Sequence, residues 1–209
     1  MATPKPQIRS LFATPICQHF HPIATEANVE LRPIIIEKAQ AVGGTIDGQG
    51  WRSAPDFESW GGAHAEHLLR VVRELADGLT ASRAGTRVNI DWKIATVAAV
   101  RQNGDCQELA ARPGAFWSGV YYVDDGYGKS DDPALGGVCE LGDPRGTLPA
   151  MLEPQLGFKI PGGLTAGQSE TIRPQTGMII LHPSWVTRGE RRYEGQGQRL
   201  TVEFDLSVP

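Results

Sequence analysis

The last strand-like segment of the sequence carries the side chains with the clearest chemical use. In RLTVEFDL, alternation with apolar residues places four polar side chains on one face of a predicted strand: Arg199, Thr201, Glu203 and Asp205. A guanidinium and a hydroxyl two residues apart can hold a carboxylate together, the first by a fork of hydrogen bonds and the second by one more. The alternative is an ordinary Arg at a strand end that pairs with a surface acid.

No set of residues identifies a catalytic centre. Tyr122 shares strand parity with Ser118 in WSGVYYV and could give a phenolic hydrogen bond to the same carboxylate, although a strand Tyr is more often part of the core. Acid–base chemistry without a metal would have to use Tyr121, Tyr122, His182 or Glu203. None of them has a partner at a diagnostic spacing, so the catalytic residues stay unassigned.

Two histidine pairs have spacings that could chelate a metal ion, His19-x-His21 and His64-x-x-His67. Both pairs lie outside the strands expected to form a pocket, which favours accidental spacing. Around His182, Glu203, Cys106 and Glu108 no ligand spacing is recognisable either. The cysteines are far apart and form no CxxC pair, which is typical of reduced thiols and not of a disulfide framework or a zinc site: Cys17, Cys106 and Cys139.

Composition predicts an ordinary globular protein of one domain. The 209 residues are 40% hydrophobic and 21% charged, and the 25 Gly and 15 Pro indicate many turns between short strands. A net charge of −4 without a basic run gives no reason to expect nucleic acid or an anionic membrane as a partner. The sequence contains neither a signal-peptide pattern nor a stretch long enough to span a membrane, so we expect a cytoplasmic protein.

The elements that must position these residues are mostly strands. The segment 87–100 alternates apolar and polar residues and predicts one long half-buried strand. Further strands are predicted in WSGVYYV, GGVCEL, MIILH and RLTVEFDL, after an opening strand in IRSLFATPICQHF that stops near Pro22. Many short strands after two helices favour helices on one side of a mainly antiparallel sandwich or jelly roll.

Both predicted helices lie in the first half of the chain. The first, in TEANVELRPIIIEKAQAVGG, is expected to begin at a Thr25 cap, to be broken or started late by Pro33, and to end at a Gly pair. The second has apolar residues at helical spacing: Ala65, Leu68, Leu69, Val72, Leu75, Ala76 and Leu79. Two loops, DDGYGKSDDPALGG and LTAGQSETIRPQTG, flank the strands and are either lids or ordinary connections.

Four blocks together resemble the family of 2-oxoglutarate/iron(II)-dependent oxygenases: LFATPI, RPGAFWSGVYYV, LGDPRG and HPSWVTRGERRYEGQGQRLTVEFDL. The resemblance implies a double-stranded β-helix, a relative of the jelly roll and cupin folds, as a single domain over residues 1–209. In this division residues 1–86 supply a strand and supporting helices, and residues 87–209 form the β-helix core. It also implies 2-oxoglutarate as co-substrate, held by an Arg-x-Ser/Thr pair that corresponds to Arg199 and Thr201.

The chain departs from the family pattern at the iron ligands. Family members hold iron through His-x-His or His-x-acid before the SGVYY strand and another His after PSW. These positions correspond to Ala110, Arg112 and Arg188. Ala has no donor atom and Arg has no lone pair to give a metal, so the resemblance argues against iron(II) here. Two guanidiniums would formally supply the charge of +2 that the ion would have brought.

Three hypotheses about function follow. The first is an oxygenase-like protein without iron that binds a small anionic molecule through Arg112, Arg188, Arg199, Thr201 and Tyr122, either as a divergent enzyme or as a binding protein. The second is an active 2-oxoglutarate-dependent hydroxylase whose metal ligands have not been identified. The third is a pseudoenzyme that serves as a structural or partner-binding protein with a vestigial pocket. A homodimer is compatible with all three.

Overall fold

The computed structural model describes residues 12–41, 50–146, 153, 155–156 and 167–209. Its helices and strands are β1 (Cys17–Phe20), α1 (Ala24–Ala41), β2 (Trp51–Arg52), α2 (Phe57–Trp60), α3 (Gly62–Leu79), β3 (Lys93–Arg101), β4 (Gln107–Ala110), β5 (Trp117–Asp124), η1 (Pro133–Leu135), β6 (Cys139–Leu141), β7 (Glu170–Ile172), β8 (Met178–Pro183), β9 (Arg188–Glu190) and β10 (Arg199–Ser207). None of the helices within these residues combines the length and apolar character needed to cross a membrane.

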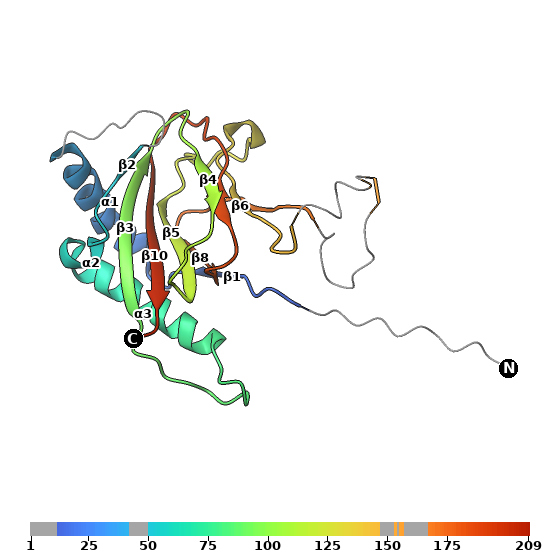
Figure 1. The fold of residues 1–209 in the computed structure, drawn as a ribbon. Coiled ribbons are helices and arrows are strands. Elements are labelled where there is room, and N and C mark those ends of the chain that lie inside the picture. The colour runs from blue at the N-terminus through green and yellow to red at the C-terminus, as the bar shows by residue number, and fades with distance from the viewer. Residues whose placement is uncertain (1–11, 42–49, 147–152, 154, 157–166) are drawn as a thin grey trace.

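Two antiparallel sheets form the body of the molecule. The larger has the strand order β1-β8-β5-β10-β3-β2, and the smaller has the order β4-β9-β6-β7. The helices α1, α2 and α3 lie along one side of the larger sheet, and the smaller sheet lies on its other side (Figure 1). This arrangement confirms the prediction of a mainly β fold with helices on one face.

The alternation of β10 separates an apolar layer from a polar interior. Its apolar residues join the hydrophobic core beneath the helices: Leu200, Val202, Phe204 and Leu206. The residues between them, Arg199, Thr201 and Glu203, are buried on the opposite face, where the two sheets meet. Strand β10 is the fourth strand of the larger sheet, hydrogen-bonded to β5 on one side and to β3 on the other. The predicted shared face of Arg199, Thr201 and Glu203 is therefore confirmed.

Helix α3 is confirmed, and helix α1 differs from its prediction. Helix α1 begins at Ala24, so a cap at Thr25 was wrong, and it continues through Pro33 without a break. The helix tolerates Pro33 because that residue lies on its exposed side, and Val29, whose carbonyl loses its helical partner, is 69% exposed. The buried stripe is Ala27, Leu31, Ile35 and Ala39, and the predicted stop at the Gly pair lies outside the described residues.

The predicted strand over 87–100 is shorter than expected. Strand β3 begins only at Lys93, which pairs with Ser207, the last residue of β10. Trp92, just before it, is buried, and its Nε1 donates to Asp77 of α3 at 2.8 Å. Four short strands were not predicted, namely β2, β4, β7 and β9. Each has two to four residues, which is too short for alternation to be read from sequence.

Candidate functional site

The space between the two sheets is lined by charged side chains. Guanidiniums of Arg101, Arg188 and Arg199 are at most 5% exposed, and the carboxylates of Glu190 and Glu203 are 1% and 7% exposed. Strands β3, β9 and β10 supply all five. Burying a charge is costly unless it is paired, so the positions of these partners determine what the site can hold.

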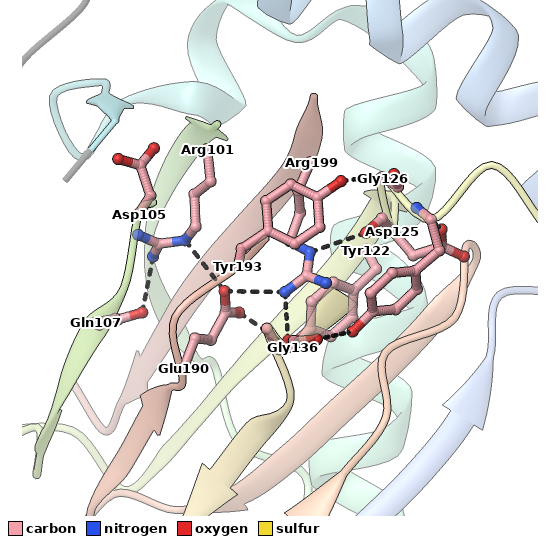
Figure 2. Close-up of polar contacts among 12 residues, drawn as sticks. Arg101, Asp105, Gln107, Tyr122, Asp125, Gly126, Gly136, Glu190, Tyr193 and Arg199 are labelled. Atoms are coloured by element: carbon pink, nitrogen blue, oxygen red, sulfur yellow. Dashed lines mark hydrogen bonds and ion pairs between the residues drawn. The ribbon is translucent and has the colours of Figure 1, made fainter. Parts of the chain in front are cut away.

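Glu190 lies between three arginines and a tyrosine. Its Oε2 is 3.1 Å from Arg101 Nε and 3.6 Å from Arg199 Nη1, and its Oε1 is 3.6 Å from Arg188 Nη1. The hydroxyl of Tyr122 donates to Oε1 at 3.0 Å. Figure 2 shows the Glu190 carboxylate between the guanidiniums of Arg101 and Arg199. Tyr122 thus makes the predicted phenolic contact to a carboxylate, and that carboxylate belongs to the chain itself.

Glu203 lies among four guanidiniums. Arg52 makes a fork to both of its oxygens at 2.8 and 2.9 Å, and Arg101 Nη2 donates to Oε1 at 3.0 Å. Arg188 and Arg112 approach Oε2 at 3.5 and 3.7 Å. Burial alone would raise the pKa of Glu203, but Arg188, Arg52 and Arg101 outweigh it and hold that pKa at about 2. Glu203 is therefore an anion at neutral pH.

Arg199 is fully buried in a box of aromatic rings. Its guanidinium carbon is 4.6, 4.9 and 6.0 Å from the ring centres of Tyr193, Tyr127 and Tyr122. Arg199 Nε donates to the carbonyl of Asp125 at 2.9 Å, and Nη1 donates to the carbonyl of Gly137. The loop 124–137 is thus tied to β10 through Arg199 (Figure 2).

Four donors in this interior have no hydrogen-bond acceptor among the described residues. They are Arg101 Nε, Arg188 Nη1, Arg199 Nη2 and the hydroxyl of Thr201, and each is inaccessible to solvent; Glu190 Oε2 likewise has no hydrogen-bond donor there. Arg188 Nη1 has only the 3.6 Å ion pair to Glu190. A buried donor without an acceptor costs free energy, and such groups in native proteins usually meet a ligand or an ordered water.

The structure brings together the positions expected to correspond to iron ligands. Ala110 and Arg188 are Cα partners across β4 and β9. With Arg112 they line a cavity of about 10 Å³, which is room for about one water molecule. The other lining residues are Ser118, Gly119, His182, Glu203 and Asp205. Arg112 and Asp205 also line an open hollow on the outer surface.

Among the five predicted binding residues, Arg112 and Arg188 line this cavity, while Arg199, Thr201 and Tyr122 lie deeper in the barrel. Sequence reasoning missed Glu190 and Arg101. Strand parity gives a signal for Glu190, because it lies two residues after Arg188 and must share its face if β9 is a strand. Tyr121, in contrast, points away from the barrel and donates to Asn28 of α1 at 2.6 Å.

No group of three or more His, Cys, Asp or Glu in the described ranges is placed to hold a metal ion. His21 and His67 come together outside the barrel, where His21 Nε2 is 2.9 Å from His67 Nδ1, between β1 and α3. Burial, together with the neighbouring His67, His19 and His64, lowers the pKa of His21 to about 4. These histidines therefore connect α3 to the segment that follows β1.

His182 points into the barrel, where its Nδ1 donates to the carbonyl of Pro183 at 3.0 Å. Burial lowers its pKa to about 4; the hydrogen bond to Pro183 opposes this, and the charges of Arg188 and Arg112 add to it. His182 is therefore neutral at physiological pH, and its buried Nε2 has no hydrogen-bond partner among the described side chains and backbone.

Acidification from pH 7 to pH 5 is expected to destabilise the protein by about 2 kcal/mol for each of His21 and His182. The pKa of each is about 4 when folded and 6.5 when unfolded, so below pH 6.5 only the unfolded chain takes up the proton. Urea denaturation at both pH values tests this. The double variant His21→Gln/His182→Gln should lose this pH dependence, and an unchanged dependence would show that other groups cause it.

The chain was compared with known proteins. The family model described as "Putative 2OG-Fe(II) oxygenase" matches residues 98–205, just over half of the chain. No curated protein sequence matches. Among solved structures, a prolyl-4-hydroxylase from Pseudomonas putida is 14% identical, with a TM-score of 0.59 over 93% of this chain and 92% of that one.

Two further solved structures have the same fold. HygX from Streptomyces hygroscopicus, solved with nickel and 2-oxoglutarate bound, is 14% identical, with a TM-score of 0.61 over 93% of this chain and 83% of that one. A prolyl hydroxylase from Trichoplax adhaerens, solved with a peptide of hypoxia inducible factor, is 10% identical, with a TM-score of 0.61 over 92% and 83%. These likenesses confirm the predicted double-stranded β-helix.

Proposed function

The chain belongs to the 2OG-Fe(II) oxygenase family, and we propose that it is an iron-independent member that binds a small carboxylate inside its barrel. The ligand class includes 2-oxoglutarate, which is bound to HygX in its solved structure. The observation that carries the proposal is the set of buried donors without acceptors among the described residues: Arg199 Nη2, Arg188 Nη1 and the Thr201 hydroxyl.

The residues at the family's ligand positions do not fit an iron ion. Ala110 offers no donor atom, and Arg112 and Arg188 bring fixed positive charge to within 3.7 and 3.5 Å of Glu203. Glu203, the nearest carboxylate, is already held by Arg52 and Arg101. A divalent cation entering here would meet guanidiniums at close range, which is unfavourable at any effective dielectric constant.

A carboxylate suits the same interior for three reasons. On the strands that line the barrel, three buried guanidiniums face only two buried carboxylates. Asp105, the nearby buried acid in the β3–β4 turn, accepts instead from the backbone N–H of Gln102 at 2.6 Å. The free donors are guanidinium and hydroxyl groups, which match the lone pairs of a carboxylate in number and geometry.

In this proposal the barrel binds and orients a carboxylate ligand, and none of its side chains is assigned as a catalyst. His182 is neutral, and Glu203 is an anion bound by arginines. Burial, together with the neighbouring Glu190, keeps the pKa of Tyr122 well above its ordinary value. A hydroxylase that uses other metal ligands remains the second hypothesis. A partner-binding protein with a vestigial barrel remains the third, and ligand measurements separate it from the first.

Replacement of Thr201 by Val tests the proposal. Thr201 has no partner among the described residues, so this nearly isosteric change should leave the unliganded protein equally stable or slightly more stable. We expect 2-oxoglutarate or succinate to raise the melting temperature of the wild type and to bind Thr201→Val about 10- to 100-fold more weakly, the cost of roughly one hydrogen bond to a charged group.

Thr96→Val is the matched control. Thr96 lies on the helix side of β3, and its hydroxyl accepts from the backbone N–H of Glu58 at 3.0 Å. This variant should lose stability and keep the ligand affinity of the wild type. If neither 2-oxoglutarate nor succinate stabilises the wild type, or if Thr201→Val binds them as tightly as the wild type does, the proposed site is wrong.

A further inference from the structure

Glu190 already occupies the position that an incoming carboxylate would need. We propose that Glu190 is a built-in competitor, an internal carboxylate that holds the ligand-binding arginines when the barrel is empty of ligand and sets how tightly an external carboxylate binds. This inference rests on the proposed function, because it concerns the same interior and asks what a ligand must overcome there.

The Glu190 carboxylate is surrounded by a phenol and three guanidiniums. Glu190 Oε1 accepts a hydrogen bond from the Tyr122 hydroxyl at 3.0 Å. Its Oε2 forms an ion pair with Arg101 Nε at 3.1 Å, outside hydrogen-bond geometry, and two more guanidiniums lie within 3.6 Å. These are the partners that recognise free carboxylates in proteins, namely phenol and guanidinium donors gathered around one anion. The side chain is 1% exposed, so these contacts are shielded from bulk solvent.

Glu190 leaves hydrogen-bond donors of Arg188 and Arg199 unused. Its distances to Arg188 and Arg199 are both 3.6 Å, which is beyond hydrogen-bond length. Arg188 Nη1 and Arg199 Nη2 accordingly have no hydrogen-bond acceptor among the described residues. Glu190 therefore neutralises these two guanidiniums electrostatically without using all of their donors, and a second carboxylate could hydrogen-bond to both.

The charge of Glu190 affects the free energy of binding of any external carboxylate. A ligand carboxylate at Arg188 and Arg199 would lie next to the anionic Glu190 and share its counter-charges, and like charges in a buried site repel strongly. Glu190 thus lowers the affinity for every external carboxylate, and a ligand must either displace it or bring additional contacts. The same residue explains how the barrel folds without a ligand, because Glu190 supplies the negative charge that the arginines require.

The experiment compares Glu190→Gln with Glu203→Gln. Both changes remove one buried carboxylate charge from the same barrel, but Glu203 is held mainly by Arg52 and Arg101, whereas Glu190 lies beside Arg199. Calorimetric titration with 2-oxoglutarate and succinate is expected to show at least about 10-fold tighter binding to Glu190→Gln than to wild type. Glu203→Gln should gain no more than about 3-fold, a difference of less than about 1 kcal/mol.

The outcomes separate the two proposals. If the wild type binds these ligands and Glu190→Gln binds them no better than Glu203→Gln does, Glu190 is no competitor and the proposed function stands. If the wild type binds neither 2-oxoglutarate nor succinate, the proposed function fails, and this inference, which rests on it, fails too.

A second variant keeps the inference testable if Glu190→Gln does not fold. Glu190→Ala, purified in acetate, frees the space of the side chain beside Tyr122 and Arg101. Acetate should raise its melting temperature over a millimolar range, and by more than it raises that of the wild type, with acetamide as the neutral control of the same shape. Equal effects of acetate and acetamide on this variant would overturn the inference.

Discussion

Replacement of Arg101 by Met is expected to destabilise the protein by about 3 to 5 kcal/mol. Arg101 is 2% exposed and contacts both buried carboxylates, Glu190 at 3.1 Å and Glu203 at 3.0 Å. Met matches the length of the apolar part of Arg but leaves both acids with one cation fewer in a dry interior. Urea denaturation followed by fluorescence at pH 7 measures the change.

Arg112→Met is the matched control for that prediction. Arg112 is 30% exposed and approaches Glu203 and Asp205 only at 3.7 and 4.0 Å. Its removal is expected to cost less than about 1 kcal/mol, as for partly exposed ion pairs in general. Equal losses from the two variants would mean that the buried network contributes nothing beyond ordinary surface charge, contrary to the role assigned to Arg101.

Gly137→Ala is expected to destabilise the protein by about 3 kcal/mol and to abolish carboxylate binding. Gly137 has a φ of +63°, and a Cβ added there would lie 2.6 Å from Arg199 Nη1 and 2.8 Å from Nη2. The guanidinium is enclosed by aromatic rings and cannot retreat without losing its bonds to the loop carbonyls. Chemical denaturation and ligand titration on the same samples measure both effects.

Gly128→Ala separates backbone strain from contact with Arg199. Gly128 lies in the same loop with a φ of +58°, and a Cβ there would meet no atom within 4 Å. The substitution should cost only the left-handed backbone contribution of about 1 kcal/mol and leave ligand binding intact. The role assigned to Gly137 is wrong if both variants lose the same stability and both still bind ligand.

The layered fold could be predicted because the strongest sequence signals are local. The period of 3.6 residues over 62–79 and the alternation in 199–207 each specify a face, and both faces are buried as expected. Tertiary context decided the remaining elements. Helix α1 continues through Pro33 because the proline faces solvent, and β3 begins only at Lys93, where its partner strand β10 ends at Ser207.

The sequence could predict where the candidate site lies, but not which carboxylates pair with its arginines. Arg112 and Arg188 line the cavity between the sheets, Arg199 is buried in the barrel, and Ala110 is the Cα partner of Arg188. That these positions correspond to the family's iron ligands stays a prediction. Glu203 meets Arg101 and Arg52 across 102 and 151 residues of sequence. No local pattern contains that information.

A barrel stabilised by its own ion pairs has a physical advantage over one that depends on a bound ion. The Arg–Glu contacts supply the counter-charges of the buried guanidiniums from within the chain. Buried pairs are weak contributors to net stability, because desolvation offsets the attraction, yet the loss of one partner is costly. We therefore expect the network to tolerate ligand exchange and not the loss of Arg101.

The most direct test of iron-independent carboxylate binding is a calorimetric titration of 2-oxoglutarate into protein treated with EDTA, repeated after anaerobic addition of Fe(II). We predict the same Kd in both titrations, no iron retained after desalting, and no succinate formed in air. One iron retained per chain, with tighter 2-oxoglutarate binding and succinate formation, would contradict the proposal and show that the chain is an active oxygenase.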